Sequence, residues 1–207
     1  MKPSLDAGWL AEAAAALREA NLAFAKAHPG EHPGRQPVHT VYGGAHLFAS
    51  DTVPKLGGLG LRALHRYAPD AATLGEALRI GKHPALGVIH QRVRGKLLAE
   101  PIEDFRIDFE DGYGNRPDAE EDGHAAVVAA ALAQGRRAGT LSPFIGIRIK
   151  PLNEEFRGRS IRTLDLVHTA LVETGGLPEY WVVTIPKITV LEQVEFAVAV
   201  LRDLERT

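Results

Sequence analysis

The chain has 207 residues, of which 45% are apolar and 24% are charged, a composition typical of a globular domain. Its net charge of −2 does not favour nucleic acid or an anionic membrane as a partner, and the absence of cysteine excludes disulfides, thiolate catalysis and cysteine-ligated zinc. No apolar run approaches the roughly 20 residues of a membrane helix, and the N-terminus lacks an apolar signal core, so we expect a soluble, cytoplasmic protein.

The N-terminal part of the sequence predicts a helix followed by a loop. Residues 4–27 carry a rough apolar stripe, with Ser4 as the candidate N-cap. Residues 28–37 are rich in proline and glycine, which is typical of a loop. We expect residues 1–36 to form this helix and loop, and residues 37–207 to form a single domain.

From residue 38 onward, β-rich runs alternate with helical segments. Strands are predicted at 38–42, 104–110, 144–150 and 180–185. Helices are predicted at 58–68, 71–80, 86–98, 117–138, 160–174 and 190–205, with Asp118 near one helix start, Gly139 beyond its end and Ser160 as the next N-cap. This alternation predicts an α/β fold of parallel βα units. Four such units are half of a (β/α)8 barrel, so we expect a partial TIM barrel over residues 37–207.

Acidic residues gather at the end of the second predicted strand. Arg106, Asp108 and Glu110 alternate along it and therefore share one face. In a barrel, Asp108 and Glu110 would lie near the carboxyl-end mouth, where active sites form. Paired carboxylates there could hold a divalent cation, directly or through water, or act as acid and base. One of them could instead pair with Arg106 or Arg148, and Asp111 could cap the following turn.

Basic residues gather at the ends of the next two predicted strands. Gly146, Arg148 and Lys150 share one face of the third strand, and Lys187 follows the fourth. An arginine at such a position can clamp a carboxylate bidentately. Opposite charges that converge at one mouth could form either a carboxylate-substrate site or an internal ion-pair network. His46, in the turn after the first strand, could also reach the mouth.

Taken together, these strand ends resemble the HpcH/HpaI aldolase and citrate lyase β-subunit superfamily, a branch of the phosphoenolpyruvate/pyruvate-type barrel enzymes. The run Asp108-Phe-Glu-Asp111 resembles that family's acidic motif. Gly146-Ile-Arg-Ile-Lys-Pro-Leu152 resembles its arginine motif, although Lys150 stands where the family often has asparagine. Val182-Val-Thr-Ile-Pro-Lys187 resembles its Pro-Lys motif, and the similarity covers roughly residues 37–207.

The resemblance implies an enzyme, a carbon–carbon lyase of the aldolase or citrate lyase type. Its substrate would be a small oxo-acid or an acyl-CoA, and Mg²⁺ or Mn²⁺ would act as a Lewis acid. Arg148 would bind the substrate carboxylate or carbonyl, with Asp108 and Glu110 as the other catalytic candidates. Glu110 and Asp111 would hold metal-bound waters or orient Arg148. The substrate-binding candidates are Arg148, Lys187 and His46.

The family's direct metal ligands are a Glu and an Asp on strands five and six, which have no counterpart in these 207 residues. We therefore expect this chain alone to be an incomplete catalyst. It would be the N-terminal portion of a longer enzyme, or a barrel completed in a homo-oligomer or by another chain. The alternative hypothesis is a non-catalytic half-barrel that pairs with itself or with a partner chain. An unrelated open α/β binding domain would leave the charged strand ends unexplained.

Overall fold

The computed structural model describes residues 4–31, 33–81 and 83–206, and the chain divides into two compact units, Met1–Gln36 and Pro37–Thr207. In the first unit, helix α1 spans Ala7–Ala27 and none of its residues is buried. Asp6 caps this helix, because its carboxylate accepts the amide of Trp9 at 2.9 Å. The prediction of Ser4 as the N-cap is therefore wrong, since the helix begins later than its apolar stripe indicates.

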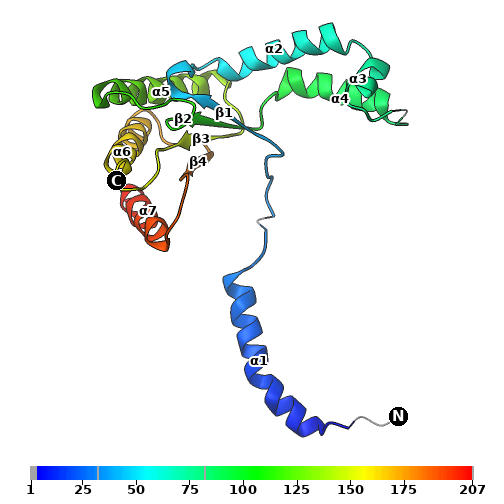
Figure 1. Cartoon of the computed structure of the whole chain (residues 1–207), viewed down its shortest axis with the longest axis vertical. Helices are drawn as coiled ribbons and strands as arrows, with labels where there is room; N and C mark the ends of the chain where they lie inside the picture. Colours follow the sequence, from blue (N-terminus) through cyan, green and yellow to red (C-terminus); the bar gives the residue numbers. More distant parts are fainter. Residues whose placement is uncertain (1–3, 32, 82, 207) are drawn as a thin grey trace. The chain divides into compact units, whose positions relative to one another are not determined.

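The second unit is built on four parallel strands that lie in chain order, β1-β2-β3-β4 (Figure 1). These strands are β1 (Thr40–Gly44), β2 (Asp104–Asp108), β3 (Phe144–Arg148) and β4 (Tyr180–Thr184). In the register of the sheet, Asp108 lies between Gly44 and Arg148. Helices connect every pair of neighbouring strands, as parallel pairing requires. The predicted α/β class and the parallel βα units are confirmed.

The connections carry the helices in the order that the sequence predicts. A short 3₁₀ turn, η1 (Ala45–Leu47), follows β1. The helices after it are α2 (Thr52–Tyr67), α3 (Ala71–Ala77), α4 (Leu86–Ala99), α5 (Asp118–Ala138), α6 (Arg157–Glu173) and α7 (Leu191–Leu204). Helix α2 begins earlier than predicted, because a proline in the first turn, here Pro54, does not interrupt a helix. In the described ranges, no helix has the length and apolarity that a membrane span needs.

The strands differ from their predicted bounds for local reasons. β1 is shifted toward the C-terminus because Gly43 and Gly44 pair with Ile107 and Asp108 of β2. β2 ends at Asp108 rather than at residue 110, because a turn begins there. The carbonyl of Glu110 accepts the amides of residues 113 and 114, at 3.0 and 2.7 Å. β3 likewise ends at 148 rather than at 150. The charged residues beyond these ends therefore lie in loops.

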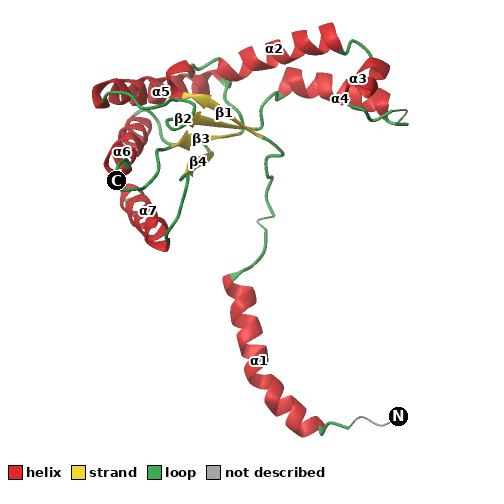
Figure 2. Ribbon diagram, in the orientation of Figure 1, coloured by secondary structure: helices red, strands yellow, loops and turns green. Residues whose placement is uncertain are grey.

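The two faces of the sheet are chemically different. Because side chains alternate along a strand, Phe105, Ile107, Ile145 and Ile147 share one face. They form the main core with residues of α5, α6 and α7 (Figure 2). Asp104, Arg106 and Asp108 lie on the opposite face and are also buried. The sheet thus presents a polar face whose charged side chains run toward its carboxyl end.

Two helix ends test the predicted boundaries. Helix α5 begins at Asp118 as predicted and ends at Ala138, and it is followed by Gly139, whose left-handed backbone (φ 66°) suits glycine. Helix α6 begins at Arg157, with Phe156 at the capping position. The prediction of Ser160 as the N-cap is wrong, because Ser160 lies within the helix and its hydroxyl donates to the carbonyl of residue 150 at 2.7 Å. This bond ties α6 to the loop after β3.

Candidate functional site

The centre of the candidate site is an arginine–aspartate pair at the carboxyl ends of β2 and β3. Asp108 and Arg148 are register partners on neighbouring strands, so their side chains leave the sheet next to each other. Arg148 donates from Nε to Oδ1 of Asp108 at 2.8 Å and from Nη2 to Oδ2 at 2.6 Å. This is a bidentate ion pair. Asp108 is 1% exposed whereas the side chain of Arg148 is 19% exposed, so the guanidinium is the part that reaches solvent.

The loop after β2 completes the surroundings of Asp108. The amide of Glu110 donates to its Oδ1 at 2.9 Å, and the amide of Gly112 donates to its Oδ2 at 2.7 Å. Burial raises the pKa of Asp108, but the bonds from Arg148 and from the two amides outweigh it and hold the pKa below its usual range. A Cβ at position 112 would lie 2.7 Å from the same Oδ2, so glycine permits this close approach. The ionised Asp108 therefore fixes the orientation of Arg148.

Two more acids and a lysine surround the guanidinium. Glu110 Oε2 lies 3.3 Å from Arg148 Nη1, and Asp111 Oδ2 lies 3.8 Å from Nη2. Lys187, in the loop after β4, pairs with the carboxylate of Glu110 and lies 2.9 Å from Oδ1 of Asp111. Hydrogen bonds to Glu110 and then to Asp111 raise the pKa of Lys187. We call Asp108, Glu110, Asp111, Arg148 and Lys187 the carboxyl-end cluster.

A cavity opens beside this cluster. Its volume is about 330 Å³, and its lining includes Glu110, Asp111, Lys150, Phe156 and Lys187. This volume falls in the range of small-ligand sites, roughly 300–1,000 Å³.

The arrangement bears on the two interpretations of the charged strand ends. The ion pairs are those that an internal network would make, and Arg106 pairs with Asp104 at 2.8 Å rather than with the acids of the cluster. A network that served only the fold would need no cavity beside it and no partly exposed guanidinium. Both features are present here, and they favour a binding site for a small acid.

Tyr42 is a neighbour of the cluster that the sequence did not single out. The guanidinium of Arg148 lies over its ring, 4.6 Å from the centroid. Such a cation–π contact restrains the plane of the guanidinium. The only sequence signal is that Tyr42 falls within a predicted strand neighbouring the acidic one, which does not distinguish it from a packing residue.

The ring contacts of His46 are with residues outside the carboxyl-end cluster. It belongs to η1, directly after β1, and its side chain is exposed. Its ring centroid lies 5.7 Å from that of Tyr113 and 6.4 Å from that of His124. The described contacts of His46 are therefore with the loop after β2 and with α5, and its predicted role in substrate binding stays a prediction.

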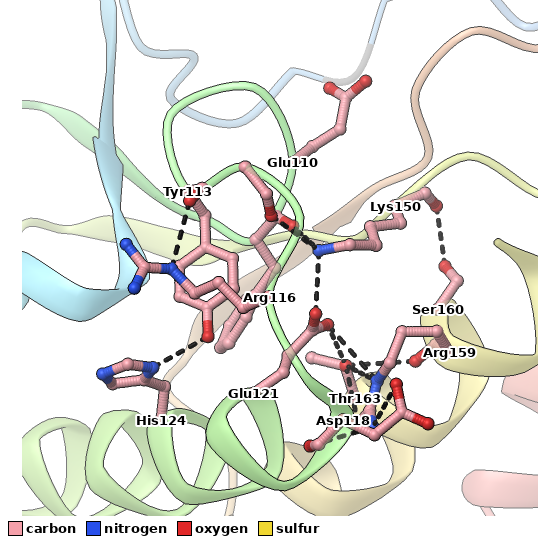
Figure 3. Close-up of polar contacts among 12 residues, drawn as sticks. Glu110, Tyr113, Arg116, Asp118, Glu121, His124, Lys150, Arg159, Ser160 and Thr163 are labelled. Carbon is pink, nitrogen blue, oxygen red and sulfur yellow. Dashed lines mark hydrogen bonds and ion pairs between the residues drawn. The ribbon is translucent and has the colours of Figure 1, made fainter.

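Lys150 does not lie on the same strand face as Arg148. The prediction that it does is wrong because β3 ends at Arg148, and the backbone has left the sheet at Lys150. The ammonium of Lys150 turns toward α5, where its Nζ lies 2.8 Å from Oε2 of Glu121 (Figure 3). Glu121 is 0% exposed, although an acid in the first turn of a helix reads in the sequence as a surface residue. No sequence signal could have identified it.

The acids of the cluster do not fit a metal ion as direct ligands. Asp108 is occupied by Arg148 and two amides, and Glu110 and Asp111 are paired with Arg148 and Lys187. In the described ranges 4–31, 33–81 and 83–206, no group of three or more His, Cys, Asp or Glu side chains could hold a metal ion. These residues can bind an anion through Arg148 and Lys187.

A family model described as a domain of unknown function, DUF6986, matches residues 17–207. The chain belongs to the DUF6986 family. Comparison with curated proteins and with solved structures gave no match. The DUF6986 match spans all four strands and every residue of the carboxyl-end cluster, so the cluster lies within the part of the chain that defines the family.

Proposed function

We propose that this chain carries the substrate-binding part of a carbon–carbon lyase of the aldolase or citrate lyase type, acting on an oxo-acid or an acyl-CoA. The observation that carries the proposal is the buried Asp108 that holds a partly exposed Arg148 at the carboxyl end of a parallel sheet. The resemblance of the strand-end motifs to the HpcH/HpaI aldolase and citrate lyase β-subunit superfamily supports the same reaction class.

Arg148 would bind the carboxylate of the substrate. A guanidinium has five N–H donors, and Asp108 takes two of them. The remaining donors lie toward Glu110 and Asp111 at longer distances, 3.3 and 3.8 Å, which a stronger acceptor could displace. Because Asp108 is held on both oxygens, it would keep the guanidinium in place while the ligand enters.

Lys187 would supply a second positive charge to the same ligand. Its side chain is 58% exposed and its ammonium lies between Glu110 and Asp111. The backbone of Lys187 has a left-handed conformation (φ 53°), which is uncommon for a residue other than glycine. In the proposed lyase, Lys187 would favour the build-up of negative charge on the substrate oxygen, and Glu110 would be available as an acid or base.

The proposal includes a (β/α)8 barrel to which this sheet contributes four strands. Three features support it: the strands are parallel, they follow chain order, and their polar face runs toward the carboxyl end. The resemblance also implies Mg²⁺ or Mn²⁺, which would supply Lewis-acid chemistry when bound. Since the acids described here do not fit a metal as direct ligands, the roles of Arg148, Asp108 and Lys187 are derived without it.

The proposal can be tested by titrating the protein with oxalate, a stable analogue of an oxo-acid, in a calorimeter. We expect the wild type to bind oxalate and Arg148→Ala to bind it about 10- to 100-fold more weakly, because charge-assisted hydrogen bonds are lost. Arg162→Ala is a matched control, since Arg162 also forms a two-pronged pair with an aspartate, Asp122, but on the outer surface of α6. Its affinity should equal that of the wild type. A wild type that binds no oxalate, or equal losses in both variants, would contradict the proposal.

A second candidate function is a non-catalytic half-barrel that pairs with itself or with a partner chain. The observation that favours it is that β1 and β4 each pair with a single neighbour in the described sheet, and unpaired edges are available to other strands. Apolar side chains after β4, such as Val190 and Leu191, are also exposed. Light scattering that shows a stable monomer would count against this candidate, as would lyase turnover.

A further inference from the structure

The ammonium of Lys150 is surrounded by acceptors from two directions. Its Nζ donates to the carbonyl of Phe109 at 2.6 Å and to the carbonyl of Gly114 at 3.3 Å. It also forms the ion pair with Glu121, and it lies 5.0 Å from the ring centroid of Tyr113. The ammonium therefore donates two hydrogen bonds and is neutralised by one carboxylate. Lys150 is 4% exposed, so these contacts, rather than water, account for its hydrogen bonding.

Glu121 is in turn held by helix α6. The hydroxyl of Thr163 donates to its Oε1 at 2.6 Å, and Nε of Arg159 lies 3.5 Å from the same oxygen (Figure 3). Arg159 also pairs with Asp122 of α5. The ion pair of Lys150 and Glu121 is therefore attached to both α5 and α6, which contribute residues to the hydrophobic core of the unit.

The two carbonyls that Lys150 binds are the two ends of the loop that carries the acids of the cluster. Between Phe109 and Gly114 lie Glu110 and Asp111, whose carboxylates surround Arg148 and Lys187. Lys150 binds both ends of this loop, and it lines the same cavity as Glu110, Asp111 and Lys187. Within the loop, the hydroxyl of Tyr113 hydrogen-bonds Nδ1 of His124 on α5 at 2.7 Å, which adds a second attachment.

We infer that Lys150 and Glu121 are positioning residues of the carboxyl-end cluster, which fix the loop of residues 109–114 so that Glu110 and Asp111 face Arg148 and Lys187. The inference rests on the proposed function for the identity of the ligand, whereas the contacts of Lys150 and Glu121 do not depend on that function. In this role Lys150 is not a nucleophile or a substrate contact, because its ammonium donates two hydrogen bonds and pairs with Glu121 within the protein. A buried ion pair contributes little to the net stability of a fold. We therefore assign to this pair the role of holding the loop in place.

The inference is tested by hydrogen exchange and by oxalate affinity in Lys150→Met. The amides of residues 110, 112, 113 and 114 are all hydrogen-bonded within the loop or to Asp108, so they report its order. We expect them to exchange at least about 10-fold faster than in the wild type, relative to the amides of β2 and β3, since a charged hydrogen-bond network is lost. Oxalate should bind about 10-fold more weakly.

Lys96→Met is the matched control, because Lys96 pairs with the buried Glu103 at the opposite end of the sheet. It should leave both the loop exchange and the oxalate affinity unchanged. The double variant Lys150→Met/Glu121→Gln covers the case in which the single variant does not fold, because it leaves no unpaired buried carboxylate. It should show the same selective loosening of the loop.

The outcomes separate this inference from the proposed function. Equal acceleration of loop and strand amides in the Lys150 variants would overturn the inference, because Lys150 would then act on the whole fold. A wild type that binds no oxalate would contradict the proposed function, and the exchange of the loop amides would still decide the role of Lys150. Selective loosening of the loop with unchanged oxalate affinity would overturn the inference as well, since Glu110 and Asp111 would not depend on their positioning.

Discussion

The two ends of the sheet carry similar charges but use them differently. At the amino end, Glu103 accepts the amide of Val38 and the ammonium of Lys96, and Asp104 pairs with Arg106 and accepts the hydroxyl of Thr40 at 2.7 Å. These partners are strand residues or residues of the connections that lead into the strands. At the carboxyl end, the cluster around Arg148 also borders a cavity, and its cations are partly exposed.

The comparison shows that charge at a strand end does not by itself mark a site. Asp104 and Asp108 are both 1% exposed, and both are paired with an arginine. The side chain of Arg106 is 11% exposed and that of Arg148 is 19% exposed, and a cavity borders Glu110, Asp111 and Lys187 of the carboxyl-end cluster. The feature that distinguishes the carboxyl end is the space beside its charged groups, which a ligand could occupy.

The largest expected effect comes from removing either aspartate. Asp104→Ala and Asp108→Ala should each lower the free energy of unfolding by about 3–5 kcal/mol, because each removes the buried carboxylate from an ion pair with an arginine. Only Asp108→Ala should also weaken oxalate binding, since only Arg148 is proposed to contact the ligand. Urea denaturation and calorimetric titration of the two variants measure these effects. A loss of oxalate affinity in both variants would remove the distinction between the two ends.

A smaller effect concerns the protonation of Glu103. Hydrogen bonds from Lys96 and from the amide of Val38 lower the pKa of Glu103 to about 2, below the value of about 4.3 in an unfolded chain. Its contribution to stability is therefore complete above about pH 4.3 and is lost as the pH falls toward about 2. Glu103→Gln should be less stable than the wild type at pH 7, and the difference should disappear near pH 2.

Urea denaturation over this pH range measures the effect, and oxalate binding at pH 7 should be unchanged in Glu103→Gln. A stability difference that stays constant down to pH 2 would show that the carboxylate of Glu103 is not held in its ionised form. Glu103 would then contribute to stability only through packing.

The central pair of the site could be predicted from the sequence because its position depends only on where two neighbouring strands end. Asp108 and Arg148 end neighbouring parallel strands, and the carboxyl ends of such strands meet at one edge of the sheet. Their contact with each other, and with Glu110, Asp111 and Lys187, follows from this topology. Alternation gave a wrong position for Lys150, because β3 and its alternation end at Arg148.

The contacts that the sequence could not predict all depend on tertiary packing. Glu121 is buried because α5 lies against α6, where Thr163 and Arg159 provide its partners. Ser160 donates to the carbonyl of Lys150 instead of capping a helix, since α6 begins a turn earlier than its sequence indicates. Helix packing of this kind has no signature in a single sequence, because each residue is individually compatible with a solvent-exposed helix.

The carboxyl-end cluster has an excess of negative charge, which has a consequence for ligand entry. With every group ionised, Arg148 and Lys187 contribute +2, and Asp108, Glu110 and Asp111 contribute −3, so the cluster carries a net charge of −1. An anionic substrate would increase this imbalance in a partly dehydrated site. Binding is therefore expected to take up a proton or a cation from solution. The heat of an oxalate titration would then depend on the ionisation enthalpy of the buffer, or on the concentration of the added cation.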